Sequence, residues 1–338
     1  MTTLPPPGPA SVRHLPVNLF AAVMGLSGLA LAWRVAHALF GAPALVGEAI
    51  AALAVGVFVL LATAYLAKLV RHPGVVLAEY RHPVSGNFFG TIAISVLLLS
   101  AVAQPYSDAA AGALWTAGAL AAFAQGFVIV SRLLGGQVDA SHALPAWLIS
   151  GVATLDIAVT GGGVTLPWAA ETSLAAGAVG SVLALAMFVL IVGRLVHREP
   201  LAPAMRPSLM ILVAPFAVGF LAYANIAGHL DRFAGLLFWF GVFIFLVAAT
   251  QVFRRGVPFT VAWWAISFPL AALANAGLRW SHFAGGTAAS ALALAALVAL
   301  TAGLGVLAVL TVRIALNGQL LGGSPALVTP SRLGTARA

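Results

Sequence analysis

Long apolar runs, separated by short polar loops, make up most of this sequence. A helix that spans a bilayer needs about 20 mainly apolar residues, because the hydrocarbon core is roughly 30 Å thick. Ten segments meet this requirement and are predicted to be transmembrane helices. Their approximate bounds are Val17–Phe40, Leu45–Val70, Phe88–Ala103, Ala109–Gly135, Ala146–Val164, Ser173–Val196, Leu209–Ile226, Phe233–Phe253, Thr260–Ala276 and Thr287–Leu316.

Composition supports the same fold class and excludes two others. Of the 338 residues, 62% are hydrophobic and 7% are charged, whereas a soluble domain has about 25% charged residues. So few charges cannot cover a water-soluble enzyme, and so many apolar residues are not typical of a disordered chain. The sequence has no cysteine, which excludes disulfides, cysteine-ligated metals and thiol catalysis. The chain is therefore predicted to be an all-α polytopic membrane protein.

The basic residues predict the orientation of the chain in the membrane. The net charge is +8, but the basic residues are isolated in short loops without interleaved aromatic residues, so no nucleic-acid partner is expected. If both termini are cytoplasmic, thirteen of the sixteen lysines and arginines lie inside, as the positive-inside rule requires. The three that lie outside are then Arg34, Arg232 and Arg279.

A period of about 60 residues runs through the loops. The inner-side arginines that follow successive pairs of spans lie 61, 62, 60 and 59 residues apart: Arg71, Arg132, Arg194, Arg254 and Arg313. The outer-side acids lie 60, 63 and 60 residues apart: Glu48, Asp108, Glu171 and Asp231. Two spans with their loops have this length, so the ten spans are interpreted as five helical hairpins. Evenly spaced spans without a structural repeat would give similar intervals, and this alternative stays open.

The odd-numbered and even-numbered spans differ in composition. Each odd span is introduced by a proline, which suits a first turn because its missing N–H loses nothing there: Pro16, Pro83, Pro145, Pro207 and Pro258. The odd spans also hold more Gly, Ser, Thr and internal proline, which suit helix interfaces and water paths. The even spans are mainly Ala, Val and Leu, which suit lipid. The pattern predicts an inner ring of five odd helices and an outer ring of five even helices.

Two odd spans contain a proline in mid-membrane, next to a phenylalanine. Pro215 is followed by Phe216, and Pro269 follows Phe268. Proline kinks a helix and frees a carbonyl, which in lipid must be satisfied by protein or water. Both prolines are therefore interpreted as kinks that border a cavity, and Phe216 as a pore-lining or structural residue. Phe268 is a candidate gate that blocks or dewets the lumen; the alternative is an ordinary packing residue.

Few polar side chains lie well inside the predicted spans. Asp156 is the only ionisable one, and such residues suggest a function by default. It is interpreted as a pore-lining or structural residue that is protonated, paired with Arg34 or Arg279, turned into a helix interface, or carrying a coupled proton. Asn275, Asn225 and Gln125 are interpreted mainly as interhelical contacts, with a pore-lining role for Asn275 as the alternative.

No pattern in the sequence predicts a catalytic or metal centre. The loop RHPGVVLAEYRHPVSGNFFG contains His72, Glu79 and His82, but their spacing matches no standard zinc site, and a solvated cytoplasmic loop is expected instead. A Ser/His/Asp set, paired carboxylates and a phosphate loop are all missing from the sequence. We therefore expect no cofactor, no metal and no enzymatic activity.

The two ends of the chain are expected to lie outside the membrane domain. Residues 1–14 begin with a Pro-rich stretch and are predicted to be a flexible cytoplasmic segment without a signal peptide. Residues 317–338 are rich in Gly, Ser and Pro and are predicted to be a flexible cytoplasmic tail. Residues 15–316 then form the ten-helix channel domain.

Two stretches resemble a known family. They are HPVSGNFFGTIAIS (82–95) and VPFTVAWWAISFPLAALANAG (257–277), and the segments at 18–34, 144–159 and 221–245 support them. They resemble the tellurite-resistance/dicarboxylate transporter family, which includes the slow-type anion channel of plant guard cells. The resemblance runs from about Leu15 to Leu316. It implies five hairpins in quasi-fivefold arrangement around a central pore, a homotrimer with one pore in each protomer, and a pore-occluding phenylalanine that matches Phe268.

The expected function is an anion channel of the cell (inner) membrane that conducts small monovalent anions through a Phe-gated pore. Helix N-termini and basic residues on the cytoplasmic side attract anions, and a nearly uncharged lumen selects by the cost of dehydration. The expected partners are small inorganic or organic anions and the lipid bilayer. The alternative is a proton-coupled transporter or exporter of dicarboxylate, sulfite or tellurite-type oxyanions, for which Asp156 would carry the proton.

Overall fold

The computed structural model describes residues 11–136 and 139–322, and within these ranges every regular element is a helix. Nine helical segments are long and apolar enough to cross a membrane, and the shorter apolar segment Pro145–Gly161 makes the tenth. The ten predicted spans are therefore present, with ends shifted by a few residues. The predicted flexible termini lie largely outside the described residues, since 1–10 and 323–338 are not part of them.

Each odd-numbered span begins as a 3₁₀-helix and continues as an α-helix. The five pairs are η2 (Val17–Phe20) with α1 (Ala21–Phe40), η3 (Ser85–Phe89) with α4 (Gly90–Ala103), η5 (Pro145–Trp147) with α6 (Leu148–Gly161), η6 (Pro203–Val213) with α8 (Ala214–Ala227), and η7 (Val261–Ile266) with α10 (Ser267–Ala284). A proline lies within three residues of the start of each 3₁₀ segment, where its missing N–H and fixed φ are tolerated. Four of the five predicted prolines thus introduce their odd spans, whereas Pro207 lies inside η6, which begins at Pro203. The first turns are 3₁₀ rather than α.

The even-numbered spans are uninterrupted α-helices. They are α2 (Ala44–Arg71), α5 (Asp108–Leu134), α7 (Ala169–His197), α9 (Arg232–Val252) and α11 (Thr287–Leu316). Between 17% and 39% of their most apolar windows is buried, against 61% to 78% for four of the odd spans. In α6, the α-helix of the remaining odd span, every residue except Val159 is buried. The prediction of inner odd helices and outer even helices is confirmed.

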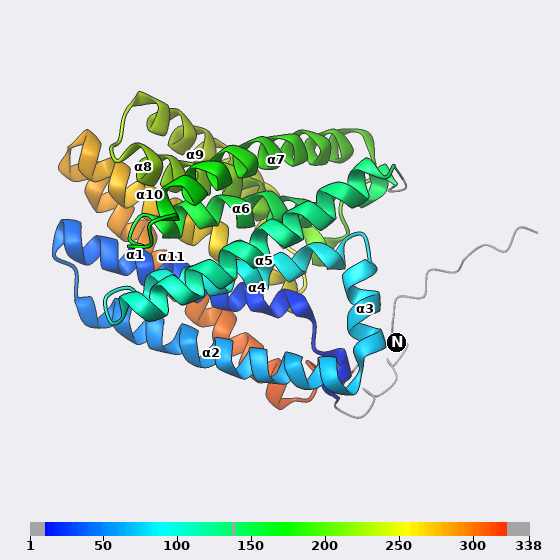
Figure 1. Cartoon of the computed structure of the whole chain (residues 1–338). Coiled ribbons are helices and arrows are strands. Elements are labelled where there is room, and N and C mark those ends of the chain that lie inside the picture. The colour runs from blue at the N-terminus through cyan, green and yellow to red at the C-terminus, as the bar shows by residue number, and fades with distance from the viewer. Residues whose placement is uncertain (1–10, 137–138, 323–338) are drawn as a thin grey trace, which may run out of the picture.

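The inner helices form a closed ring. Along it α1 packs on α4, α4 on α6, α6 on α8, α8 on α10, and α10 again on α1. The 3₁₀ segments repeat this order, since η2, η3, η5, η6 and η7 each contact the next and η7 returns to η2. Five hairpins therefore surround one axis, and we call the end of the bundle that holds these segments the 3₁₀ end (Figure 1).

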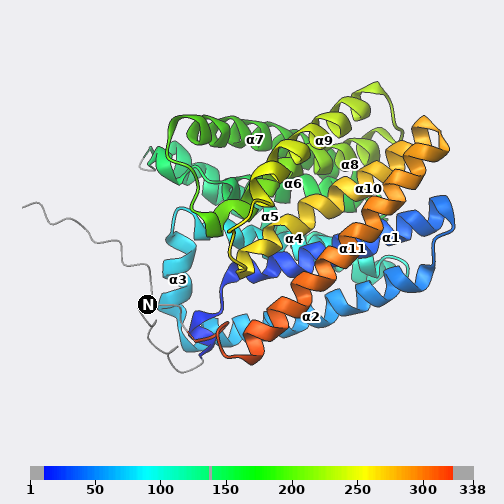
Figure 2. The ribbon, with the colours of Figure 1, turned by 180° about the vertical axis from the view of Figure 1, so that it is seen from behind.

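The outer helices cover the joints of this ring. Most of them pack on their own inner partner and on the next inner helix, as α5 does on α4 and α6, and α11 on α10 and α1. Figure 1 shows α2, α5 and α7 on one side of the bundle, and Figure 2 shows α9 and α11 on the other. Their outward faces carry large exposed apolar side chains such as Leu60, Val182 and Trp239. Such a surface suits lipid and not water.

The predicted solvated loop between the first two hairpins contains a further helix, so that prediction is wrong. Helix α3 (Pro73–Arg81) runs across the 3₁₀ end of the bundle (Figure 1). Glu79 holds it in place, because one carboxylate oxygen accepts from Val17 N (3.0 Å) and the other from Tyr65 Oη (2.9 Å) and Lys68 Nζ. Lys68 is 2% exposed and also donates to Leu15 O at 2.7 Å. The lysine thus pairs inside the fold and is not a free loop charge.

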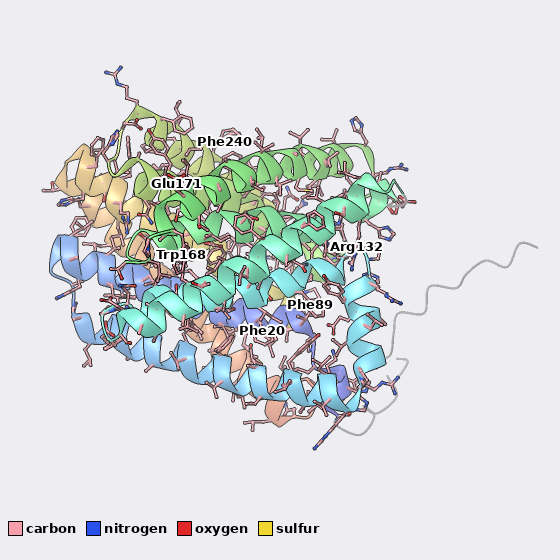
Figure 3. The ribbon with its side chains drawn as sticks, viewed as in Figure 1. Phe20, Phe89, Arg132, Trp168, Glu171 and Phe240 are labelled. Atoms are coloured by element: carbon pink, nitrogen blue, oxygen red, sulfur yellow. The ribbon has the colours of Figure 1, made fainter. Side chains whose placement is uncertain are left out.

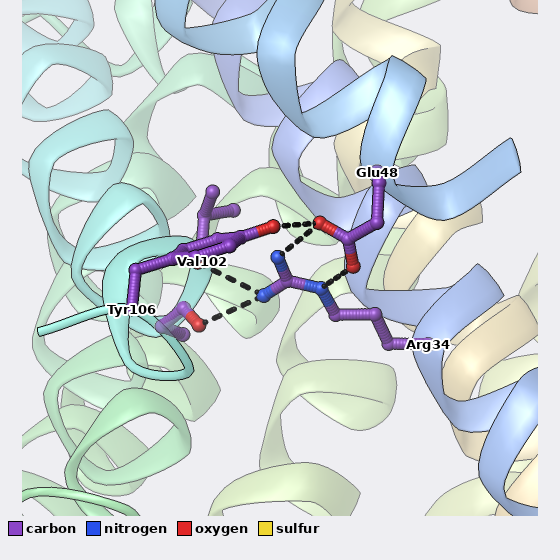
Figure 4. A network of polar contacts seen from close by, with 5 residues as sticks. Arg34, Glu48, Val102 and Tyr106 are labelled. Carbon is purple, nitrogen blue, oxygen red and sulfur yellow. Dashed lines mark hydrogen bonds and ion pairs between the residues drawn. The ribbon is translucent and has the colours of Figure 1, made fainter. Parts of the chain in front are cut away.

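The opposite end of the bundle carries a second ion pair (Figure 4). Arg34 donates from Nε and Nη2 to the two oxygens of Glu48, at 2.8 and 2.9 Å, and from Nη1 to Val102 O at 2.9 Å. Tyr106 donates its hydroxyl proton to the same carboxylate. This contact raises the pKa of Tyr106, because ionisation would place a phenolate beside a carboxylate. The cluster joins the first hairpin to the second.

The described ends of the chain meet at the 3₁₀ end. The short 3₁₀ turn η1 (Val12–His14) precedes the first span, and Ser11 N donates to Leu321 O at 3.0 Å. An even number of spans places both ends on one side of the membrane, as the charge pattern requires.

Candidate functional site

A small cavity lies where the five inner segments meet. It has a volume of about 30 Å³, and all five inner spans contribute residues to its wall. They are Ala21, Met24, Phe88, Thr91, Ile94, Ile149, Val152, Ile211, Ala214, Trp264, Ala265, Phe268 and Pro269. We call this space the axial cavity. Its volume matches about one water, so an ion cannot keep its hydration shell there.

The residues that line the axial cavity occupy equivalent positions in the five inner spans. Every lining residue lies within four positions of the start of its inner α-helix. The cavity therefore sits at the depth where each inner span changes from 3₁₀ to α, and the first turns of five α-helices surround it. The wall holds no charged side chain, and the hydroxyl of its only polar one, Thr91, donates to Phe88 O at 2.6 Å. The cavity is thus apolar.

Phe268 is the second residue of α10 and borders the axial cavity. Its side chain is almost fully buried, with 5% exposure. The preceding residue anchors this turn to α1, because the Ser267 hydroxyl lies 2.7 Å from Trp264 O and 3.1 Å from Ala21 O. The sequence therefore placed Phe268 on a cavity-facing helix, and the structure places the residue in the cavity wall.

Two glycines of α1 allow the close approach that seats Phe268. A Cβ at Gly25 would lie 2.2 Å from Ser267 Oγ, which is far inside contact distance. A Cβ at Gly28 would lie 3.0 Å from Ala271 Cβ and 3.7 Å from Phe268 Cδ2. The missing side chains let α10 lie against α1, so the position of the ring depends on both helices. The sequence suggested small residues at inner interfaces but not these two contacts.

The two mid-membrane prolines occupy the junctions between 3₁₀ and α-helix. Pro215 is the second residue of α8, and Pro269 is the third residue of α10. Pro269 lines the axial cavity, whereas Pro215 does not. A missing N–H is tolerated in a first helical turn. Both prolines therefore mark the change of helix type beside the cavity and do not bend a continuous α-helix.

Phe216 points away from the axis. Its ring lies edge-on to Phe188 of α7 at 5.1 Å and to Phe240 of α9 at 4.5 Å between ring centroids. It does not border the axial cavity. Of its two predicted roles, pore-lining and structural, the packing matches the structural one.

Asp156 is buried without a polar partner. It is 1% exposed, and neither carboxylate oxygen accepts a hydrogen bond from the described residues. The proposed pairing with Arg34 or Arg279 is wrong, because Arg34 binds Glu48 and Arg279 Nε donates to Asn275 Oδ1 at 3.0 Å. Asp156 does not line the axial cavity, but it lies one turn beyond Val152 on the same face of α6.

Three other polar residues singled out in the sequence, Gln125 of the outer helix α5 and Asn225 and Asn275 of inner helices, bind backbone or a neighbouring side chain. Gln125 Nε2 donates to Gly86 O at 2.8 Å, and Asn225 Nδ2 donates to Ala158 O and Val159 O, so both are interhelical as predicted. Asn275 is 8% exposed and accepts from Arg279 within α10. Among the described residues no group of three or more His, Cys, Asp or Glu side chains could hold a metal ion.

The sequence reasoning missed most of the cavity wall. Residues such as Phe88, Ile149 and Ile211 are ordinary apolar residues, and only their shared distance from the start of an inner helix marks them. The proline that introduces each odd span marks roughly where the span begins, and so could have indicated which residues lie near that start. The length of the 3₁₀ segment, which ranges from 3 residues in η5 to 11 in η6, was not visible in the sequence.

A family model described as a voltage-dependent anion channel, SLAC1, matches residues 14–312. The chain belongs to the SLAC1 family. The resemblance stated from the sequence is therefore confirmed.

Curated relatives of this SLAC1-family chain come from plants, bacteria and archaea. The S-type anion channel SLAH3 of Arabidopsis thaliana is 26% identical over 79% of the chain and 43% of the relative. A tellurite resistance protein TehA homolog of Haemophilus influenzae is 27% identical over 79% of the chain and 82% of the relative. An uncharacterized transporter of Methanocaldococcus jannaschii is 26% identical over 58% and 63%. The chain thus spans about half the length of the plant relatives SLAH3 and SLAH2.

Proposed function

We propose that this SLAC1-family protein is an anion channel of the cell (inner) membrane, with one pore in each protomer closed by Phe268. The observation that carries the proposal is the axial cavity. Five inner spans surround it, it lies where a pore on the bundle axis must pass, and Phe268 borders it. At about 30 Å³ with an apolar wall, this point is a dewetted constriction. In this proposal, rotation of the Phe268 ring out of the cavity wall opens the path.

Selectivity for anions follows from the helix dipoles. Each inner span is one continuous helix whose positive dipole end lies at the start of its 3₁₀ segment, so five positive dipole ends face the mouth of the path at the 3₁₀ end. No side-chain charge in the wall binds an ion tightly, which suits fast passage of anions that shed water readily. With both termini cytoplasmic, most of the arginines lie on the cytoplasmic side and add an attractive potential at that mouth, whereas Glu79 neutralises Lys68. We further propose that the protein is a homotrimer, as the family resemblance implies.

The channel proposal is tested by currents from purified protein in planar bilayers under anion substitution. We expect unitary currents whose reversal potential follows the anion gradient and not the cation gradient. Larger monovalent anions that dehydrate readily should carry more current than chloride. Flux that saturates at low turnover and shows no unitary currents would contradict a channel.

One observation favours the alternative, a proton-coupled transporter of dicarboxylate, sulfite or tellurite-type oxyanions. Asp156 is buried, has no polar partner among the described residues, and lies one turn beyond the cavity wall on α6. A carboxyl group in such a site can take up and release a proton during a transport cycle. Flux that follows an imposed pH gradient at fixed voltage, and is lost in Asp156→Asn, would favour this transporter over the channel.

A further inference from the structure

A second cavity lies at the 3₁₀ end, beside the axis. It has a volume of about 520 Å³ and is bordered by the end of α3, by η3, by the end of α5 and by η5. Arg81, His82 and Arg132 line it, together with Asn87 and Trp147. Figure 3 shows Arg132 at the 3₁₀ end, far from Trp168 and Glu171 at the opposite end. We call this cavity the basic pocket.

The basic side chains of the pocket are not neutralised within it. Three of the residues that line it carry basic side chains, and none carries a carboxylate. Neither Arg81 nor Arg132 takes part in an ion pair with another described residue. Arg132 is held in place by neutral partners, because Nη1 donates to Tyr80 O at 2.8 Å and the guanidinium lies 4.6 Å from the centre of the Tyr80 ring. Its other N–H groups stay available to an anion.

His82 adds a further donor. Its Nδ1 accepts from Val84 N at 3.2 Å and from Ser85 N at 3.1 Å, so a neutral imidazole carries its proton on Nε2. Asn87 is 2% exposed, and its Nδ2 donates to Pro83 O at 2.9 Å. The pocket therefore offers guanidinium and imidazole N–H groups, with no carboxylate acceptor to compete with a ligand.

The other wall of the basic pocket is apolar. Trp147 is 5% exposed and its indole N–H is directed to Pro83 O at 3.3 Å, and Ile129 lines the pocket from α5. A monatomic anion would leave most of a 520 Å³ cavity empty, since pockets of this size hold a ligand with an organic body. Two arginines suit a group with several oxygens, because guanidinium forks bind phosphate and carboxylate oxygens in pairs.

We propose that the basic pocket binds a phosphate ester. Arg81, Arg132 and the His82 N–H hold the phosphate, and the organic part of the ligand lies against Trp147 and Ile129. Two kinds of molecule carry such a phosphate group. One is an anionic phospholipid in the adjoining leaflet, since basic pockets between membrane helices bind the headgroups of such lipids. The other is a soluble phosphate ester.

The pocket is placed to influence the axial cavity. Asn87 of η3 lines the basic pocket and the next residue, Phe88, lines the axial cavity. In the neighbouring segment Trp147 lines the pocket, and Ile149 lines the axial cavity. A ligand in the basic pocket thus contacts the two 3₁₀ segments that lead directly into the axial cavity wall. The ligand site itself does not depend on the channel proposal.

The test measures binding to the intact purified protein without any ion flux. Native mass spectrometry in a nonionic detergent compares phosphatidylglycerol with phosphatidylcholine, and calorimetry measures glycerol 3-phosphate against glycerol. The variants are Arg81→Gln and Arg132→Lys. Arg71→Gln is the matched control, because Arg71 is an exposed arginine at the same end that does not line the pocket. Arg81 makes no side-chain hydrogen bond to another described residue, so its replacement leaves the fold unchanged.

We expect the wild type to prefer phosphatidylglycerol to phosphatidylcholine, or glycerol 3-phosphate to glycerol, by at least about tenfold. Each pocket variant should weaken this binding by about ten- to a hundredfold, the value of a charge-assisted contact, and Arg71→Gln should not. Binding of the lipid alone identifies the headgroup as the source, and binding of glycerol 3-phosphate identifies a soluble ester; either upholds the site. Equal binding of both lipids without binding of glycerol 3-phosphate would overturn it, and so would an equal loss in Arg71→Gln.

Discussion

Replacing Phe268 by alanine removes the ring that borders the axial cavity. The wild-type cavity holds about 30 Å³, the share of a single water in the liquid. Deleting a phenyl ring adds on the order of 100 Å³, since cavities of that order accept benzene. The enlarged space has room for about four waters at roughly 30 Å³ each. Phe268→Ala therefore widens the constriction enough for an anion to enter with part of its own hydration shell, although an empty apolar cavity of this size stays dry.

The expected increase in flux follows from the hydration of the ion. In the wild type an anion must give up hydrogen-bonded waters to enter an apolar space, and an unmatched polar contact costs at least about 1–3 kcal/mol. Each 1.4 kcal/mol removed from a barrier raises a rate about tenfold. Phe268→Ala should therefore raise anion flux by at least about tenfold.

Efflux of chloride or nitrate from liposomes of known protein content measures this change. The matched control is Phe220→Ala, because Phe220 is fully buried in the inner helix α8, packs near Phe238, and does not line the axial cavity. It should lower stability by about 3 kcal/mol or more without raising flux. The proposed gate is refuted if Phe268→Ala conducts like the wild type at equal incorporation, or if Phe220→Ala raises flux to the same extent.

Four further variants test other parts of the structure. Asp156→Asn should leave anion conductance largely unchanged in a channel, and loss of conductance would show that the carboxyl group acts in transport. Glu79→Gln leaves the buried Lys68 ammonium without a counter-charge and should destabilise the protein by about 3 kcal/mol. Thermal unfolding in detergent measures this loss. An unchanged unfolding temperature would contradict the conclusion that Glu79 holds α3 in place. Gly25→Ala should also lower the unfolding temperature, because its Cβ meets Ser267 Oγ, and the double variant with Ser267→Ala should recover part of the loss. The pKa of Asp231 is lowered, mainly because the Tyr223 hydroxyl donates to its carboxylate and secondly because Ala234 N also donates to it. These bonds stabilise the folded state when the pH is above 3.8, the ordinary pKa of an aspartate, and this stabilisation is lost as the pH falls below that value. Asp231→Asn should therefore flatten the fall in unfolding temperature between about pH 5 and pH 3, and an identical slope in both proteins would refute this assignment.

The comparison of Phe268 with Phe216 shows where sequence reasoning stops. Both residues adjoin a mid-membrane proline in an odd span. The local sequence therefore does not distinguish which of the two faces the lumen. The structure turns Phe268 to the axial cavity and Phe216 to the outer helices α7 and α9. The rotation of a helix about its own axis depends on what packs against it, and that information lies in distant parts of the chain.

Polar partners were equally hard to predict. Arg34 was a possible partner of Asp156, but it binds Glu48, fourteen residues further along the chain. Lys68 was counted as a loop charge, yet it is buried against Glu79 of a helix that the apolar pattern did not reveal. Helix α3 has only nine residues and modest hydrophobicity, so neither its length nor its composition distinguishes it from a loop.

The number of spans, their alternation between inner and outer rings, and the common side of the chain ends followed from the sequence alone. These properties depend on how apolar each segment is and on where the charges lie. Both can be read from one segment and its flanking loops, because each segment partitions between lipid and water according to its own composition. Tertiary structure alone decided that the axial cavity lies where 3₁₀ changes to α, that Phe268 faces it, and that Arg81 and Arg132 meet in one pocket. Each of these depends on contacts between helices, whose register is set by the close packing of side chains far apart in the chain.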